Sequence, residues 1–507
     1  MNNSIFKLYL LLALFTVPNA LFAQKVNWQN MDLKADSVFG ISTEKAYNEL
    51  LKGKKSQTVI VAVIDAGVDT MHEDLKSVLW VNPKKKAFDN GTYGWSFIGS
   101  AKGNVRYDNL ELTRQVRQQQ SQFENKDSSD FHGKNLAAFK KYQVEKNELN
   151  LKRQQAVQMV QGMSNFGNIL KVIMQKIGKD TPTLADFEAY YPIDEGEKQI
   201  KSLMMTVLRK RDDFESFKEN EFNKAFKRYK EQAKYQLNIN YDPRPIVGDQ
   251  YFDSKQRNYG SPDVMGPDAT HGTHVSGIIG ALRNNEIGMN GVADNVQIMN
   301  IRTVPDGDER DKDVANAIRY ATDHGAKVIN MSFGKAYSQD KKIVDEAVKY
   351  AMRKDVLLVQ AAGNENSNID SIAHFPNRRY LNGKEANAYI VVGASGMRAD
   401  STIKASFSNY GKSSVDVFAP GVQIYSCIPG SKYAYFDGTS MASPVVAGLA
   451  ALIREYYPKL SAAEVKKIIV QSVQTTPFLK SYCKTGGVVN AYLALKMAEN
   501  FKNRNRP

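Results

Sequence analysis

The chain has 507 residues and a formal net charge of +14, the difference between 68 basic and 54 acidic residues. Its hydrophobic content of 42% and aromatic content of 10% are ordinary for a globular protein with a sizeable core. The positive charge suggests a nucleic-acid or membrane partner. However, the sequence contains no stripe of arginine with interleaved aromatic residues and no zinc-finger or helix-turn-helix pattern. We therefore interpret the charge as a solvated basic surface and predict no nucleic-acid partner.

The beginning of the chain has the features of a signal peptide. Lys7 precedes a short apolar run, 8–17, which ends at Pro18 and small residues. This run is too short for a membrane-spanning helix, which needs about 20 apolar residues, but its length suits a signal peptide. We predict that residues 1–23 form a signal peptide, with an uncleaved anchor as the alternative. The protein is then expected to be exported, to the periplasm or the extracellular medium, without stable membrane insertion.

Residues 24–100 are predicted to form the first part of an α/β domain. The run "TVIVAVIDAGVD", 58–69, is rich in β-branched residues and ends in Gly and Asp. Continuous apolar runs of this kind are typical of strands that are buried on both faces of a parallel sheet. Asp65 is expected at the carboxyl end of this strand.

Residues 101–250 differ in composition and hydrophobic pattern and are predicted to form an all-α insert. Lys, Glu and Gln are frequent, and apolar residues recur at the spacing of an amphipathic helix. We expect the segment 178–192 to form the turn between long helices. The spacing is clearest at Ile200, Leu203, Met204, Val207 and Leu208.

Residues 251–507 return to the α/β texture. Short apolar strands alternate with helical patterns, which indicates parallel βαβ units. Ser461 and Glu464 form a capping-box pattern before a further helix. The predicted fold class is α/β, with a mostly parallel central sheet flanked by helices in three layers. The strands are expected in 296–304, 326–334, 355–364 and 388–395, and the intervening helices in 312–325 and 340–354.

Three residues far apart in the sequence suggest nucleophilic catalysis. A serine hydroxyl is a weak nucleophile unless a base takes its proton and a third group orients that base. Ser440 opens an apolar helix, His271 opens another, and Asp65 ends a buried strand. Each has a plain structural interpretation: a helix cap for Ser440, a structural histidine for His271, and a turn-capping carboxylate for Asp65.

Seven short stretches together resemble the subtilisin-like serine proteases of the subtilase superfamily. They occur in the family's order, Asp then His then Ser, and they span about residues 58–494 apart from the helical insert. This order differs from those of the chymotrypsin and α/β-hydrolase arrangements. The resemblance implies a three-layer subtilisin-like fold and a serine endopeptidase. The stretches are "VIDAGVD", "HGTHVSGIIG", "VINMSFG", "AAGNE", "FSNYG", "DVFAPG" and "GTSMASP".

The resemblance also implies roles for individual residues. Ser440 would attack the scissile carbonyl, His271 would accept its proton, and Asp65 would hold the imidazole in the correct tautomer. Asn364 would donate its side-chain amide to the oxyanion, together with backbone amides near Ser440 at the start of its helix. Protein or peptide substrates are the implied partners. The implied substrate-binding residues are Ser332, Phe333, Gly334, Ala362 and Gly363, with Phe333 lining an apolar subsite.

An acidic stretch lies within the part of the sequence that resembles the family. It contains Asp306, Asp308, Glu309 and Asp311. One hypothesis is that it forms a rim that favours basic substrate residues before the cut. The alternative is a solvated acidic loop.

No metal and no required cofactor is predicted. His271 and His274 have the H-x-x-H spacing of zinc ligands, but the H-E-x-x-H form and an obvious third ligand are lacking. Subtilases often bind structural calcium; we identify no ligand set for it in the sequence, and this point stays open. Cys427 and Cys483 could form a disulfide in an oxidising compartment or remain two buried thiols.

The insert is the main departure from the family pattern. Asp65 and His271 are 206 positions apart (271 − 65), where the family has a few tens. The insert is expected to restrict access to Ser440 as a lid, or else to pack elsewhere and serve stability or oligomerisation. A binding or scaffold protein with a relic protease domain, and an esterase with the same triad, are alternative functions.

Overall fold

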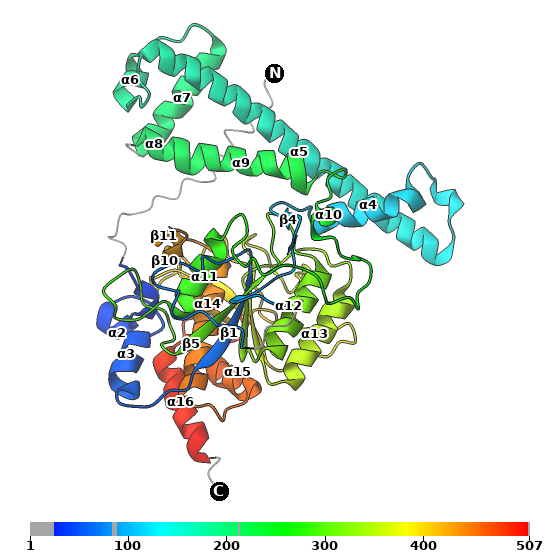
Figure 1. Cartoon of the computed structure of the whole chain (residues 1–507). Helices are drawn as coiled ribbons and strands as arrows, with labels where there is room; N and C mark the ends of the chain where they lie inside the picture. The colour runs from blue at the N-terminus through cyan, green and yellow to red at the C-terminus, as the bar shows by residue number, and fades with distance from the viewer. Residues whose placement is uncertain (1–24, 84–88, 211–212, 505–507) are drawn as a thin grey trace. The chain divides into compact units, whose positions relative to one another are not determined.

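The computed structural model describes residues 25–83, 89–210 and 213–504 (Figure 1). The predicted signal peptide, 1–23, lies outside the described residues. The chain divides into two compact units. We call Leu112–Asp242 the helical unit, and the described parts of Ala23–Glu111 and Pro243–Pro507 the α/β unit.

The described part of the α/β unit contains a nine-stranded sheet. Its strand order is β12-β13-β9-β8-β7-β6-β1-β5-β2, and neighbouring strands are parallel except for β12 and β13. In this order β1 lies between β5 and β6, which follow each other in the chain. The strands are β1 (Val59–Asp65), β2 (Gly94–Ser96), β5 (Val296–Arg302), β6 (Val328–Met331), β7 (Leu357–Ala361), β8 (Tyr389–Ser395), β9 (Val417–Pro420), β12 (Gln474–Thr475) and β13 (Gly487–Val488).

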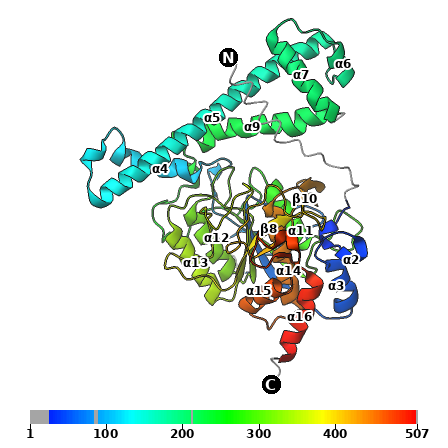
Figure 2. The same cartoon turned by 180° about the vertical axis from the view of Figure 1, so that it is seen from behind.

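Helices cover both faces of the sheet, which confirms the predicted α/β fold in three layers. One face carries α11 (Thr270–Gly280) and α14 (Thr439–Tyr456), and the other carries α12 (Asp311–Asp323) and α13 (Lys341–Arg353) (Figures 1 and 2). Two hairpins lie outside the sheet. They pair β3 (Gly99–Ser100) with β4 (Gly103–Asn104) and β10 (Ile424–Ile428) with β11 (Lys432–Phe436). The remaining helices are η1 (Trp28–Asn30), α2 (Leu33–Asp36), α3 (Thr43–Ala46), η2 (Tyr47–Leu51), α10 (Arg244–Val247), α15 (Ala462–Gln471), η6 (Pro477–Leu479) and α16 (Ala491–Arg504).

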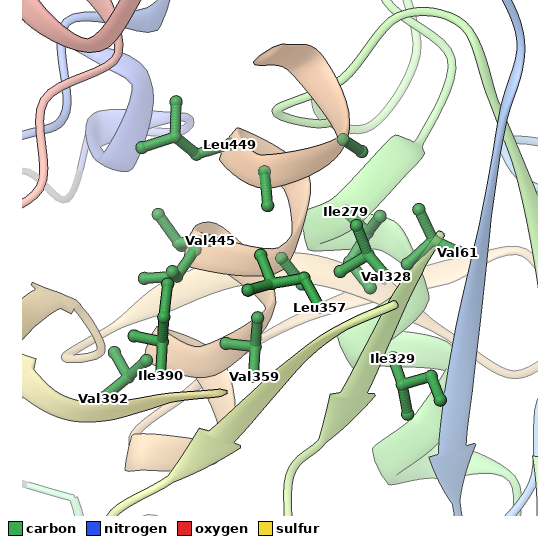
Figure 3. Close-up of a cluster of buried hydrophobic side chains, with 14 of the residues drawn as sticks. Val61, Ile279, Val328, Ile329, Leu357, Val359, Ile390, Val392, Val445 and Leu449 are labelled. Carbon is green, nitrogen blue, oxygen red and sulfur yellow. The ribbon is translucent and has the colours of Figure 1, made fainter. Parts of the chain in front are cut away.

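The core of the α/β unit lies on both faces of the sheet, and one part of it lies between the sheet and helices α11 and α14. Figure 3 shows Ile279 of α11 beside the strand side chains Val328 and Val61, with Val445 and Leu449 of α14 in the same cluster. All five side chains are fully buried. These two helices are buried on nearly every face, so they occupy a central position rather than a solvent-facing one. Their first residues are thereby held firmly at the carboxyl edge of the sheet.

The helical unit is built around one long helix, α5 (Gly133–Ile177), which ends at Gly178 in the left-handed conformation (φ 78°). The expected turn after Gly178 contains a short helix, α6 (Leu184–Ala189), with a capping box between Thr183 and Asp186. The unit's other elements are α4 (Glu111–Phe123), η3 (Ser128–Asp130), α7 (Glu195–Lys210), α8 (Phe214–Ser216), η4 (Phe217–Asn223), α9 (Lys224–Glu231) and η5 (Gln232–Gln236).

The core of the helical unit follows the predicted amphipathic pattern. Four of the five residues singled out in the sequence are buried, and Val207 packs partly buried beside them. Aromatic side chains of α5 and α8, such as Phe166 and Phe214, complete this core. Since these residues bury apolar surface only against each other, the unit has a core of its own. The four buried residues are Ile200, Leu203, Met204 and Leu208.

The helical unit is shorter at both ends than the predicted insert, 101–250. Asp108, before it, makes a bidentate pair with Arg310 at 2.7 and 2.9 Å. Arg244, after it, pairs with Asp313 at 2.6 Å. Both pairs are buried and lie within the α/β unit. Local sequence composition does not reveal such long-range ion pairs. For this reason the composition alone assigned these flanking segments to the insert.

Candidate active site

Three predicted residues stand at the carboxyl edge of the sheet. Asp65 is the last residue of β1, and His271 and Ser440 are the second residues of α11 and α14. Strand β1 lies at a point where the strand order reverses, because β5 pairs with one edge of β1 and the next strand, β6, pairs with its other edge. In open parallel sheets, such a switch point at the carboxyl ends of strands is where sites form.

The Asp65 carboxylate orients the His271 ring. Nδ1 of His271 lies 2.7 Å from Oδ1 of Asp65. Asp65 is 2% exposed, and its Oδ1 also accepts the Ala66 backbone N–H at 2.7 Å. Gly272 allows this approach, because a Cβ there would collide with the carbonyl oxygen of Gly67. A buried carboxylate on Nδ1 places the N–H on that nitrogen and leaves Nε2 as the proton acceptor.

Burial and charge act in opposite directions on His271. Burial disfavours the imidazolium, but the charge and hydrogen bond of Asp65, with a smaller effect of Asp268, outweigh it and raise the pKa of His271 above its usual value. A raised pKa makes the ring a stronger base. It also means that the ring becomes neutral, and able to accept a proton, only at a higher pH than an isolated histidine.

Ser440 is held by a chain of hydrogen bonds that starts inside the core. The Ser443 hydroxyl donates to Oδ1 of Asn330 at 2.7 Å, and Asn330 donates to the Ser332 hydroxyl at 2.9 Å. Ser332 in turn donates to the Ser440 carbonyl at 2.9 Å. The Ser440 hydroxyl donates to the Ser332 carbonyl at 3.0 Å. The start of α14 and the 332–334 segment are therefore fastened to each other at the serine.

The side-chain amide of Asn364 has a defined orientation. Its Oδ1 accepts from the backbone N–H and the hydroxyl of Thr439, at 2.9 and 3.0 Å. Because Oδ1 accepts from a backbone N–H, the assignment of oxygen and nitrogen is unambiguous. Nδ2 lies 3.8 Å from the place that a Cβ on Gly438 would take, so its donors are beside the turn that carries Ser440.

The comparisons with known proteins show the family of the chain. The model of the subtilase family matches residues 56–492. The chain belongs to the subtilase family. Among curated relatives, a thermophilic serine proteinase of Bacillus sp. (strain AK1) is 41% identical over 227 residues, which are 44% of this chain and 52% of that protein. Thermitase of Thermoactinomyces vulgaris is 38% identical over 227 residues, which are 45% of this chain and 75% of that protein.

This subtilase spans about half the length of the first curated relatives that it matches, 52% and 58%. A solved protease from Pseudoalteromonas arctica PAMC 21717 matches with a TM-score of 0.41 and 28% identity, over 48% of this chain and 79% of that chain. That likeness is too loose to add to the fold assignment. Within the described ranges, no helix of the subtilase is long and apolar enough to cross a membrane.

The predicted substrate-binding residues are not equally available. Ala362 is fully buried; its N–H donates to the Val392 carbonyl at 2.9 Å, and its carbonyl accepts from Asn409 at 2.9 Å. Phe333 is 9% exposed and belongs to the core. Ser332 is also buried. Gly334 and Gly363, the glycines of the two segments, carry no side chain of their own, and neighbouring side chains occupy the places where their Cβ atoms would lie.

The acidic rim hypothesis loses two of its four residues. Glu309 and Asp311 are 2% and 5% exposed, so they do not form a rim. Lys335 pairs with Asp311 at 2.9 Å, which compensates one charge. Burial raises the pKa of Glu309 to about 8, so near neutral pH this side chain is mostly uncharged. The negative charge that the sequence suggests for Glu309 is therefore mostly absent, because packing buries its side chain.

The second histidine of the H-x-x-H pair has a structural role. Nε2 of His274 lies 3.1 Å from the carbonyl oxygens of Ile424 and Ala434, and its ring stacks on Phe436. Burial lowers the pKa of His274 to about 3. In the ranges 25–83, 89–210 and 213–504 we find no group of three or more His, Cys, Asp or Glu that could hold a metal. Cys427 and Cys483 are both free and buried, so they do not form a disulfide.

Asn409 is a site residue that the sequence reasoning missed. It lies in the "FSNYG" stretch and braces the loop that carries Asn364. Its Nδ2 donates to Glu365 at 2.7 Å, and its Oδ1 accepts the N–H groups of Glu365 and Ser367 at 3.1 and 2.8 Å. The stretch contributes to the family resemblance, but an isolated Asn between Ser and Tyr carries no local signal of this bracing role.

Proposed function

We propose that this subtilase is a serine endopeptidase that hydrolyses peptide bonds through Asp65, His271 and Ser440. The observation that carries the proposal is the hydrogen bond of 2.7 Å between Asp65 and His271, at the sheet edge where the helix of Ser440 also begins. An imidazole oriented by a carboxylate, with a serine at a helix start on the same sheet edge, supports acyl transfer.

In the proposed reaction, Nε2 of His271 takes the proton of Ser440 as Oγ attacks the scissile carbonyl carbon. The Asn364 amide donates to the oxyanion that forms. His271 then gives its proton to the leaving amine, and an acyl-enzyme remains on Ser440. Water attacks this ester, its proton passes to the same imidazole, and then to Oγ as the acid product leaves. For this reaction the Ser440 hydroxyl must leave the Ser332 carbonyl and donate to Nε2 of His271. Catalytic hydrogen bonds of this kind often form only when substrate is present.

The proposed role of Asn364 predicts a loss of turnover without a loss of binding. Asn364→Ala removes a donor that matters most when the oxyanion develops, and the effect expected is a decrease of about 10²–10³ in kcat, a range measured on subtilisin itself. KM is expected to change little. Steady-state kinetics on a peptide substrate measure both, and near-wild-type kcat would contradict the assignment.

The proposed activity is tested with purified protein on casein and on short peptides. A fluorophosphonate probe should label the protein at Ser440, and casein should be cleaved into peptides. An esterase with the same triad would be labelled and hydrolyse small esters but not casein. A scaffold protein with a relic domain would neither be labelled nor hydrolyse either substrate.

We further propose that the helical unit restricts which proteins reach Ser440. It has its own core and leaves and re-enters the α/β unit at segments held by buried ion pairs, Asp108 with Arg310 and Arg244 with Asp313. The helical unit stands in the sequence between Asp65 and His271, and this position supports the proposal. The alternative is a role in stability or oligomerisation only.

The restriction is tested by replacing Leu112–Asp242 with a short Gly/Ser linker that keeps both ion pairs. The expected result is faster cleavage of folded proteins, with kcat/KM for a short peptide almost unchanged. A thermal melt of the variant serves as the control for folding of the α/β unit. Unchanged rates on both kinds of substrate would reject the restriction.

Export and a metal-free mechanism complete the proposal. The predicted signal peptide supports export to the periplasm or beyond, where protein and peptide substrates would be met. The mechanism proposed uses only side chains and backbone amides, so no cofactor is required, and calcium would be structural.

A further inference from the structure

We propose that His374 fills the space next to the scissile bond and limits the substrate residue before the cut to small side chains. The inference rests on the proposed function and names a specificity-determining residue for it. His374 lies outside all of the stretches that carry the family resemblance.

The position of the His374 ring follows from two glycines. A Cβ on Gly334 would overlap Nε2 and Cε1 of His374, and a Cβ on Gly363 would lie 3.2 Å from Cε1. The ring therefore occupies the Cβ side of Gly334, and it shares the Cβ side of Gly363 with Nδ2 of Asn409 and Oε2 of Glu365. Substrate side chains that enter between these two segments meet an imidazole instead of an open space.

Both glycines belong to segments that hold the reactive groups. Gly334 is two residues after Ser332, which exchanges hydrogen bonds with Ser440. Gly363 directly precedes Asn364 and donates its N–H to the Thr439 hydroxyl at 3.1 Å. A peptide whose carbonyl lies between Ser440 and Asn364 must place the side chain before the cut within a few ångströms of this pair of segments.

Within the described part of the chain, the ring leaves one of its two nitrogens without a partner. Nε2 of His374 is buried and has no hydrogen-bond partner among the described residues, an arrangement that costs free energy. Burial lowers the pKa of His374, although the charge of Glu365 and the Ala361 carbonyl raise it, so the ring is neutral at neutral pH. A neutral ring with an unpartnered nitrogen is best explained as a filler of the substrate side.

At Gly334 the nearest side chain is His374, whereas Glu365 lies at the Gly363 end of the same space. Its Oε2 would lie 2.8 Å from a Cβ on Gly363, and Nδ2 of Asn409 holds the carboxylate at 2.7 Å. The side chain is exposed. Charge at the border and volume between the glycines can thus be changed separately, which allows size and charge to be distinguished.

The test uses peptides that differ only in the residue before the cut, with alanine or phenylalanine there. The wild type is expected to prefer alanine. His374→Ala opens the space, and the ratio of kcat/KM for alanine over phenylalanine is expected to fall at least about 10-fold, since a single methylene in a pocket changes such ratios by about 10–200-fold. His374→Gln, of similar volume, should keep most of the preference, and Glu365→Gln should not admit phenylalanine.

A histidine away from the site provides the matched control. His324 also faces a carboxylate, Asp89, at 2.9 Å, and His324→Ala is expected to leave the ratio unchanged. Hydrolysis by the wild type with a preference for phenylalanine, or a ratio within twofold of wild type in His374→Ala, would overturn the inference and leave the proposed function intact. Absence of any hydrolysis or of fluorophosphonate labelling in the wild type would overturn both.

A measurement on the wild type alone tests the inference even if the variants fail to fold. Mass spectrometry of peptides released from a mixed proteome gives the residue before each cut. Enrichment of Gly, Ala and Ser there is expected. Enrichment of aromatic or long aliphatic residues would overturn the inference.

Discussion

Ser440→Ala is expected to lower kcat on peptides by about 10⁶, the loss found for the nucleophile of subtilisin, and to abolish fluorophosphonate labelling. The reason is that no other group can form the acyl-enzyme once Oγ is absent. The Ser440 backbone and its hydrogen bond from Ser332 remain, so the fold should be unaffected. Peptide hydrolysis assays and intact-protein mass spectrometry after labelling measure the two effects.

The matched control for this variant is a serine outside the site. Ser472 follows α15, and its hydroxyl donates to the Ile468 carbonyl at 2.7 Å. Ser472→Ala should be labelled and active. Residual turnover of Ser440→Ala close to that of wild type, with equal thermal stability, would refute the assignment of the nucleophile.

Asp65→Asn is expected to lower kcat by about 10⁴, the size of the effect known for this substitution in a serine protease triad. An asparagine amide cannot favour the N–H on Nδ1 of His271 as a carboxylate does, so Nε2 is no longer held as the acceptor. The loss should appear in kcat while the protein still folds, since Asn keeps the volume of the buried side chain. Single-turnover kinetics with a thermal melt as control measure it.

The same substitution should change the pH dependence in a defined direction. His271 acts as a base only when neutral, so activity falls as pH drops through its pKa. Burial opposes the charged ring, but Asp65 raises the pKa of His271 above its usual value, and the acid limb of kcat/KM is expected above about pH 6.5. Removing the carboxylate charge should move this limb to lower pH. A limb that does not move in Asp65→Asn would show that the titrating group is not His271.

Local patterns in the sequence determined the elements and the positions of the candidate reactive residues at their ends. A β-branched run ending in Asp predicted β1 with Asp65 at its edge, because strands buried on both faces show continuous apolar character. Apolar helices after His271 and Ser440 predicted α11 and α14. The spacing of Ile200, Leu203 and Met204 predicted the buried side of α7. These features depend on neighbours within a few residues, and a sequence displays them directly.

Tertiary structure alone decided which groups meet and which charges persist. Asp65 and His271 are 206 positions apart, and only the return of the chain to one sheet edge joins them. Burial removed Glu309 and Asp311 from the expected rim, and Cys427 and Cys483 stayed free. His374 gained its place from the missing side chains of Gly334 and Gly363. The physical reason is the same in each case: burial, electrostatic compensation and steric exclusion depend on distances between segments that are remote in the chain, and sequence periodicity carries no information about those distances.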